Sequence, residues 1–204
     1  MRHITIMLVC IFLLVGSGIS FLFAQSANED LARLHSIFVE KGLKKLSENP
    51  AIRNSGVIEK IEPLSISYAA ELVSLLIASQ QKKLTDLMGQ TRDTMQQVQA
   101  TKSSWFGNMK NMFMQKKDKI SQAASQAKNW IPELKNTLSS KAASAYSEAI
   151  NLMASGGTPN SAAEKFIASL DRLQIDSAIK NKLQTTTNQH FKYINNILKS
   201  SLGK

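Results

Sequence analysis

Apolar side chains recur at three- and four-residue intervals along most of the chain after about residue 24. This is the spacing of one face of an α-helix, and no alternating run of apolar and polar residues indicates a strand. Two stretches show the pattern clearly: Ala69, Leu72, Val73, Leu76 and Ile77 in one, and Leu138, Ala142, Tyr146, Ile150 and Met153 in the other. The pattern predicts an all-α fold, a single helical domain of about five to seven amphipathic helices.

Capping and breaking residues predict the bounds of the first helices. Ser26 and Glu29 have the spacing of a capping box, so the first helix should begin at Ser26 and end before Pro50. Residues 54–63 contain a glycine and end in a proline, which indicates a connector with at most a single helical turn. A long helix should then begin at Ser65 and continue into the glutamine- and threonine-rich residues 90–102.

The last third of the chain carries clear stop and start signals. Gly156 and Gly157 follow an apolar stripe and predict the C-terminus of a helix. Thr158 and Pro159 predict the start of the next helix, as its N-cap and its first helical residue. Asp176 can cap a final helix. Helices joined by such short connections are expected to be antiparallel neighbours.

The segment 103–119, SSWFGNMKNMFMQKKDK, combines aromatic residues and methionines with lysines. On a helix most of its large apolar side chains lie along one side, while the lysines occupy the flanks and the opposite side. Periodicity does not decide whether protein, a lipid ligand or a membrane surface covers that apolar side. The residues that would contact a membrane are Trp105, Phe106, Met109, Met112 and Phe113.

The N-terminus carries an apolar run with the features of a secretory signal. Residues 4–24 are almost entirely apolar, follow Arg2 and contain small residues near their end, so cleavage after Ser20 or Ala24 is expected. The alternative is an uncleaved anchor, because the run is long enough to span a bilayer. We therefore expect a signal peptide at residues 1–24, a single α-helical domain at residues 25–204, and a secreted protein.

The cysteine count and the charge narrow the class of protein and its partners. Cys10 is the only cysteine and would be removed with the signal, so apolar packing must stabilise the mature chain without disulfides. The formal net charge is +10, which favours acidic surfaces. An anionic membrane surface suits an exported protein better than nucleic acid does, and nucleic acid is not an expected partner.

No group of residues in the sequence indicates an enzyme. The chain has neither a nucleophile elbow nor a glycine-rich phosphate loop. His35 and His190 have no ligand-type residue one helical turn away, so structural or surface roles are favoured over metal binding. We predict that the protein is not an enzyme and holds no metal and no cofactor.

The apolar helix faces exceed what a simple three-helix core requires, which favours a protein that encloses a lipid. The leading hypothesis is a secreted carrier that buries a fatty acid or another single-chain lipid in an apolar cavity, without chemical change. The side chains expected to bind the lipid are Leu72, Leu76, Ile150, Met153, Phe166, Ile167 and Phe191. The alternative is a secreted membrane-surface or partner-binding protein that uses the Trp105–Lys119 segment and takes no small ligand.

Residues 131–173, IPELKNTLSSKAASAYSEAINLMASGGTPNSAAEKFIASLDRL, together with the helix around Ile179, Leu183 and Phe191, resemble the nematode fatty-acid and retinol-binding protein family. Proteins of that family are secreted, cysteine-poor and all-helical, so the resemblance implies a fatty acid or retinoid ligand. The first half departs from the family, because no proline-containing opening follows the signal and residues 80–128 form a longer region than expected. The chain is also similar to the SXP/RAL-2-type family of secreted nematode proteins, which ranks second and implies the alternative function.

Overall fold

A computed structural model of the protein describes residues 33–100, 130 and 132–203, and these residues form an all-α fold with no strand among them. Six helical stretches make up this part of the chain, in agreement with the expected five to seven. They are a helix at 33–46, α2 (Pro50–Arg53), α3 (Val57–Ala100), a helix at 132–154 that contains the π-helix η1 (Leu138–Ala142) and α5 (Ala143–Ala154), α6 (Pro159–Ala168) and α7 (Ser177–Leu202). A single 3₁₀ turn, η2 (Asp171–Leu173), joins α6 to the segment before α7. The expected helix start at Ser26 and the segment Trp105–Lys119 lie outside the described residues.

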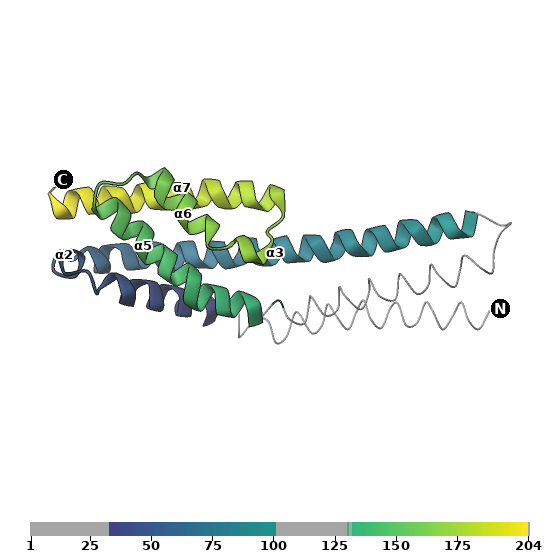
Figure 1. The fold of residues 1–204 in the computed structure, drawn as a ribbon, viewed down its shortest axis with the longest axis horizontal. Helices are drawn as coiled ribbons and strands as arrows, with labels where there is room; N and C mark the ends of the chain where they lie inside the picture. Colours follow the sequence, from purple (N-terminus) through teal and green to yellow (C-terminus); the bar gives the residue numbers. More distant parts are fainter. Residues whose placement is uncertain (1–32, 101–129, 131, 204) are drawn as a thin grey trace.

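The long helix α3 packs along α7, and α7 also packs against α5 and α6. Helix α3 contains 44 residues and α7 contains 26, so at about 1.5 Å per residue α3 is much the longer of the two. The two are antiparallel, because Lys60 near the start of α3 bonds Ser201 near the end of α7 at 3.0 Å, while Lys82 bonds Asp176 at 2.9 Å. Figure 1 shows α5 and α6 crossing this pair, and α3 continuing past the end of α7 that lies away from the C-terminus.

The expected connector at residues 54–63 is wrong, because most of it is helical. After the short helix α2, Gly56 turns the chain with φ +66°, and α3 begins at Val57, eight residues before the predicted start at Ser65. Pro63 lies inside α3, where it removes the hydrogen bond that its missing N–H would have made to the preceding turn. Val57 and Ile61 are fully buried on that part of the helix, so the packing of these residues outweighs the cost of the proline.

The predicted stop and start signals of the last third are confirmed. At the end of α5, Gly156 has φ +102°, its N–H donates to Met153 O at 3.0 Å, and the N–H of Gly157 donates to Leu152 O at 2.8 Å. This pair of bonds is the Schellman motif, in which a glycine adopts the left-handed conformation at least cost. Thr158 accepts a bond from the N–H of Ser161 at 3.2 Å and caps α6, with Pro159 as the first helical residue.

The predicted cap at Asp176 is also confirmed. Its carboxylate accepts bonds from the N–H groups of Ala178 and Ile179, the first residues of α7 after Ser177. A feature that the sequence did not predict is the π-helical turn η1, where the helix from residue 132 widens before it continues as α5. Leu138 and Ala142 at its two ends are both fully buried, so the wide turn occurs where this helix contacts the core.

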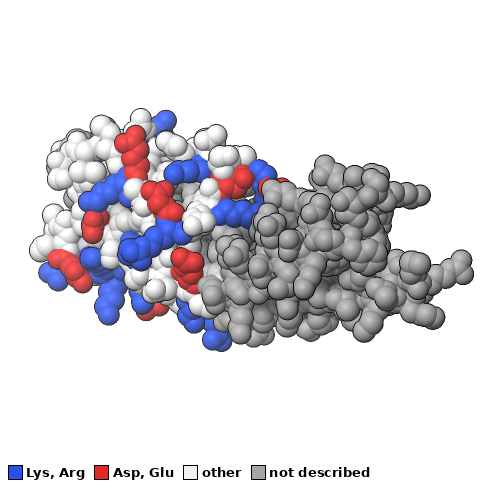
Figure 2. Space-filling model, turned by 45° about the vertical axis from the view of Figure 1, so that its right-hand side comes forward, with Lys and Arg blue, Asp and Glu red and all other residues white. Residues whose placement is uncertain are grey.

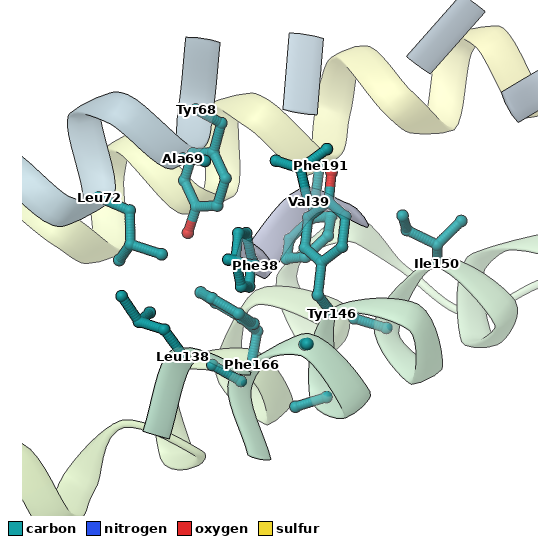
Figure 3. Close-up of a cluster of buried hydrophobic side chains, with 14 of the residues drawn as sticks. Phe38, Val39, Tyr68, Ala69, Leu72, Leu138, Tyr146, Ile150, Phe166 and Phe191 are labelled. Carbon is teal, nitrogen blue, oxygen red and sulfur yellow. The ribbon is translucent and has the colours of Figure 1, made fainter. Parts of the chain in front are cut away.

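Buried apolar side chains of all these helices form one continuous core. The side chains with the largest volume and almost no exposure are Phe38, Tyr146, Phe166 and Phe191. Figure 3 shows the middle of this core, where Tyr68 and Leu72 from α3 face Tyr146 and Phe166 across the bundle. The apolar stripes recognised in the sequence are therefore the faces that the helices bury against one another.

Candidate functional site

The seven residues expected to bind lipid come together in the core. Leu72 and Leu76 belong to α3, Ile150 and Met153 to α5, Phe166 and Ile167 to α6, and Phe191 to α7. None of these side chains is more than 6% exposed. The long helix α3 and the three later helices thus contribute the selected side chains to one shared interior, and Figure 3 shows four of them, Leu72, Ile150, Phe166 and Phe191.

Aromatic rings fill the centre of this interior. The ring of Phe166 lies 5.9 Å from that of Phe38, 6.0 Å from that of Tyr146 and 6.1 Å from that of Phe191, measured between centroids. Tyr146 also contacts Phe38 edge-on at 5.2 Å. Most of these pairs have the tilted or edge-to-face geometry that aromatic side chains prefer. Two of the seven predicted residues, Phe166 and Phe191, therefore belong to a set of rings that already contact each other.

One glycine allows the helix at 33–46 to approach this aromatic set closely. A Cβ atom on Gly42 would lie 3.1 Å from Cδ1 of Tyr146 and 3.6 Å from the carbonyl oxygen of Ala143. A larger residue would thus push this helix away from α5. The close approach brings Phe38, one turn earlier on the same helix, against Tyr146 and Phe166.

Five polar side chains lie within the same core and connect three helices. We call this group the core junction: Ser65 and Tyr68 of α3, Tyr146 of α5, and Thr187 and His190 of α7. Ser65 Oγ and Tyr146 Oη are 2.6 Å apart, Tyr146 Oη and His190 Nε2 are 2.8 Å apart, and Tyr68 Oη and Thr187 Oγ1 are 2.8 Å apart. The imidazole of His190 stacks on the ring of Tyr68 at 4.1 Å with an interplanar angle of 6°. Tyr68 shares its helix face with Leu72 and Leu76 but was not selected from the sequence, although the same apolar stripe passes through it.

The hydrogen bonds of the core junction determine where its protons lie. Ser65 donates its only hydroxyl proton to the carbonyl oxygen of Ile61 at 2.8 Å. The contact between Ser65 and Tyr146 must then be a bond that Tyr146 donates. Tyr146 in turn accepts from His190, so the imidazole carries its proton on Nε2. In this tautomer His190 is a donor to Tyr146 and not a base for it.

Burial keeps every group of the core junction uncharged at neutral pH. Desolvation raises the pKa of both Tyr68 and Tyr146 above the ordinary value of 10.0, although the hydrogen bond between Tyr68 and Thr187 and the one between Tyr146 and Ser65 oppose the shift. Desolvation also lowers the pKa of His190 from 6.5 to about 3. The junction is therefore a neutral hydrogen-bonded network in the core. Ser65 is fully buried and uses its proton on the backbone, so it does not have the environment of a catalytic nucleophile.

A second polar group connects α3 to the start of α7, and it combines the buried Ser79 with the exposed Lys82. We call it the end junction: Ser79, Gln80, Lys82 and Asp176. Ser79 Oγ accepts a bond from the backbone N–H of Asp176 at 2.8 Å, and Gln80 Nε2 donates to Leu173 O at 3.0 Å. Lys82 Nζ bonds the carboxylate of Asp176 at 2.9 Å, which raises the pKa of the lysine and lowers that of the aspartate. The end junction thus holds the loop between α6 and α7 on α3.

The other histidine and the charged groups of the described residues form no metal site. His35 is partly exposed on the helix at 33–46, and no three His, Cys, Asp or Glu side chains gather in the part of the chain that the structure describes. Lysine and arginine side chains alternate with acidic ones over the face drawn in Figure 2. The residues expected to contact a membrane, Trp105 to Phe113, lie outside the described residues.

One helix of the described residues has the length and composition of a membrane span. The first part of α3, Val57–Lys83, is apolar enough to cross a bilayer, and 44% of its apolar window is buried inside the protein. A core helix can have the same length and composition as a span. Leu72 and Leu76, which contribute to the apolar character of this segment, are at most 1% exposed and pack in the core.

Comparison with known proteins does not identify a family for the chain. No family model, no curated protein and no solved structure matches it. Any functional assignment therefore depends on the residues and the geometry described above.

Proposed function

We propose that the protein is a secreted helical carrier that binds a fatty acid or a retinoid in its core, between α3, α5, α6 and α7. The observation that carries this proposal is the convergence of seven apolar side chains from these four helices on one interior. Each methylene of a bound acyl chain would contribute about 0.8 kcal/mol on burial, so affinity would not require a specific polar contact.

Entry of a lipid requires the aromatic rings of the core to separate, and α6 is the helix best placed to move. It has only ten residues and supplies both Phe166 and Ile167 to the interior. Gly156 and Gly157 precede it, and the turn η2 follows it, so both of its ends are short non-α segments. An outward displacement of α6 would expose the predicted residues of α3, α5 and α7 to the ligand.

The test is saturable uptake of a fluorescent fatty acid by the delipidated protein. A matched pair of variants on α3 then locates the site: Leu72→Phe adds bulk inside the core, and Ile66→Phe adds similar bulk on the exposed face, where Ile66 is 45% exposed. We expect saturable binding by the wild type and by Ile66→Phe, and at least tenfold weaker binding by Leu72→Phe, because the added ring takes the space of the acyl chain.

Each protein is first compared by circular dichroism, so that a loss of binding is interpreted only in a folded variant. Absence of saturable uptake by the wild type would contradict the carrier proposal. Equal uptake by all three proteins would instead place the lipid outside the core. Native mass spectrometry of the secreted protein, followed by extraction, identifies any fatty acid or retinoid that copurifies.

The distribution of charge favours a second candidate, a protein that binds an anionic membrane surface. Residues 101–129 contain six lysines and one aspartate, so they contribute +5 of the net +10. This candidate predicts flotation with anionic vesicles and not with neutral ones, and weaker flotation at high salt. Replacement of Trp105, Phe106 and Phe113 together by Ala should abolish flotation and preserve helical content. Unchanged flotation of this variant would contradict the second candidate.

Secretion is part of both candidates and has its own test. The N-terminal sequence of protein recovered from the medium should begin at Gln25 or at Phe21, directly after one of the two predicted cleavage positions. A mature protein that begins at Met1 or Arg2 would instead indicate that the apolar run is retained as an anchor.

A further inference from the structure

Among the buried side chains of the core, His190 is the one whose protonation state is most readily changed by pH. It is 7% exposed and lies between the ring of Tyr68 on α3 and the hydroxyl of Tyr146 on α5, while belonging to α7. One imidazole thus joins three helices. Histidine is also the residue whose unperturbed pKa lies between the pH of the extracellular medium and that of acidic compartments.

We propose that the core junction is an acid-sensitive latch: protonation of His190 separates α7 from α3 and α5 and opens the helical bundle. The latch is closed while the imidazole is neutral and donates through Nε2 to Tyr146. It requires no ligand and does not depend on the carrier proposal.

The side chains around the imidazole are uncharged. Tyr68 stacks on it from α3 and Tyr146 bonds it from α5, while Ser65 of α3 bonds Tyr146 and Phe166 of α6 contacts both tyrosines. On α7 itself, Phe191 lies 5.6 Å from the ring and Thr187 bonds Tyr68. The carboxylate of Glu71, which acts electrostatically on Tyr68, is exposed and accepts a bond from Thr186 at 3.0 Å. No carboxylate of the described residues hydrogen-bonds the ring.

Protonation would add a positive charge and a second donor, Nδ1–H, to this neutral group. Nε2 already donates to Tyr146, and a charged imidazolium in this buried position loses most of its hydration without gaining a carboxylate partner among the described residues. The stack on Tyr68 attracts a cation and offsets only part of this cost. Opening of the bundle releases the imidazolium to water, so acid favours the open form.

The pH range of the latch follows from linkage. Burial lowers the pKa of His190 from 6.5 to about 3 in the folded protein. The contribution of the neutral His190 to the stability of the closed form is therefore fully present above pH 6.5. It is lost progressively as the pH falls from 6.5 toward 3. Within that window the ratio of open to closed protein rises up to tenfold for each pH unit. The lowered pKa of Asp176 acts below its ordinary value of 3.8, so a measurement above pH 4.5 separates the two groups.

The experiment measures urea unfolding of the full chain between pH 7.5 and 4.5, for the wild type and for His190→Gln. The glutamine amide can still donate to Tyr146 but cannot be protonated. We expect the unfolding equilibrium constant of the wild type to rise about thirtyfold more than that of His190→Gln between pH 7.5 and pH 5. The control His35→Gln should follow the wild type, because His35 is partly exposed on another helix. Parallel profiles of the wild type and His190→Gln would overturn the latch.

A measurement on the wild type alone keeps the proposal open to refutation if His190→Gln does not fold. Nitrogen NMR of the ring should show the Nε2–H tautomer of His190, and this signal should not titrate between pH 8 and pH 5 while the protein stays folded. Titration of His190 in the folded protein within that range, or a proton on Nδ1 in place of Nε2, would overturn the latch.

Discussion

The same two helices, α3 and α7, are joined at two polar junctions that differ in burial and in charge. At the core junction neutral side chains bond each other inside the bundle, and Ser65, Thr187 and Tyr146 are fully buried. At the end junction the main side-chain contact is an ion pair whose side chains are 46% and 17% exposed, Lys82 and Asp176. The lengths of the bonds do not distinguish the two junctions, since both contain bonds of 2.6–2.9 Å.

The burial of the bonded groups decides how much each junction contributes to the free energy of unfolding. A buried hydroxyl or imidazole that loses its partner cannot bond water in exchange, so every member of the core junction depends on the others. The charged groups of the end junction remain in contact with water. Water weakens the attraction between them, and it hydrates both groups when the ion pair is broken. We infer that the core junction selects the register of α7 on α3, because a shift by one helical turn would leave Tyr68, Thr187 and His190 without partners.

Removal of the central ring of the core junction should have the largest effect. Tyr146→Ala deletes a fully buried ring that contacts Phe38 and Phe166, and it leaves Ser65 and His190 without their common partner. The free energy of unfolding should fall by about 3–5 kcal/mol or more, measured by urea unfolding. Tyr146→Phe, which keeps the ring and removes the hydroxyl, should cost about 1–3 kcal/mol. A negligible effect of Tyr146→Phe would show that the polar bonds do not matter and that packing alone holds this region.

An intermediate effect is expected at the buried part of the end junction. Ser79 is 1% exposed, and its hydroxyl accepts the backbone N–H of Asp176. Ser79→Ala leaves that N–H without its partner, and stability should fall by about 1–2 kcal/mol, measured in the same unfolding experiment. Ser74→Ala on the exposed face of α3 is the matched control and should be close to neutral. If the two substitutions lowered the stability equally, burial would not decide how much such a hydrogen bond contributes to stability.

The exposed ion pair should have the smallest effect. Lys82→Met removes the bond to Asp176, and the midpoint of urea unfolding at pH 7 should not move beyond the scatter of the measurement. The bond to Lys82 is the main cause of the lowered pKa of Asp176, so Lys82→Met should raise that pKa. Because the folded pKa lies below 3.8, any contribution of Asp176 is present above that value and is lost as the pH falls. A clear loss of stability at pH 7 would contradict this expectation, because the exposed ion pair would then contribute to stability as the buried core junction does.

The elements that the sequence predicted well are those with a local cause. A left-handed glycine after α5, a threonine and a proline at the start of α6, and an aspartate before α7 act within a few residues of their own position. The apolar stripes were recognised for the same reason, since helical spacing places the side chains of one stripe on one face. The seven side chains that we expected to bind lipid lie on those faces and are buried for that reason, while their binding of a lipid stays a prediction.

What only the tertiary structure decided is how those faces meet. Pro63 predicted a break, yet burial of Val57 and Ile61 extends α3 through it, and the wide turn η1 has no sequence signal of its own. The core junction was missed because Tyr68, Tyr146 and His190 are ordinary members of three separate helices until the helices pack. The sequence by itself determined the helices, their caps and their apolar faces, because these depend on neighbours within about one turn. The pairing and register of the helices depend on contacts between distant residues, and only the packed bundle supplies those.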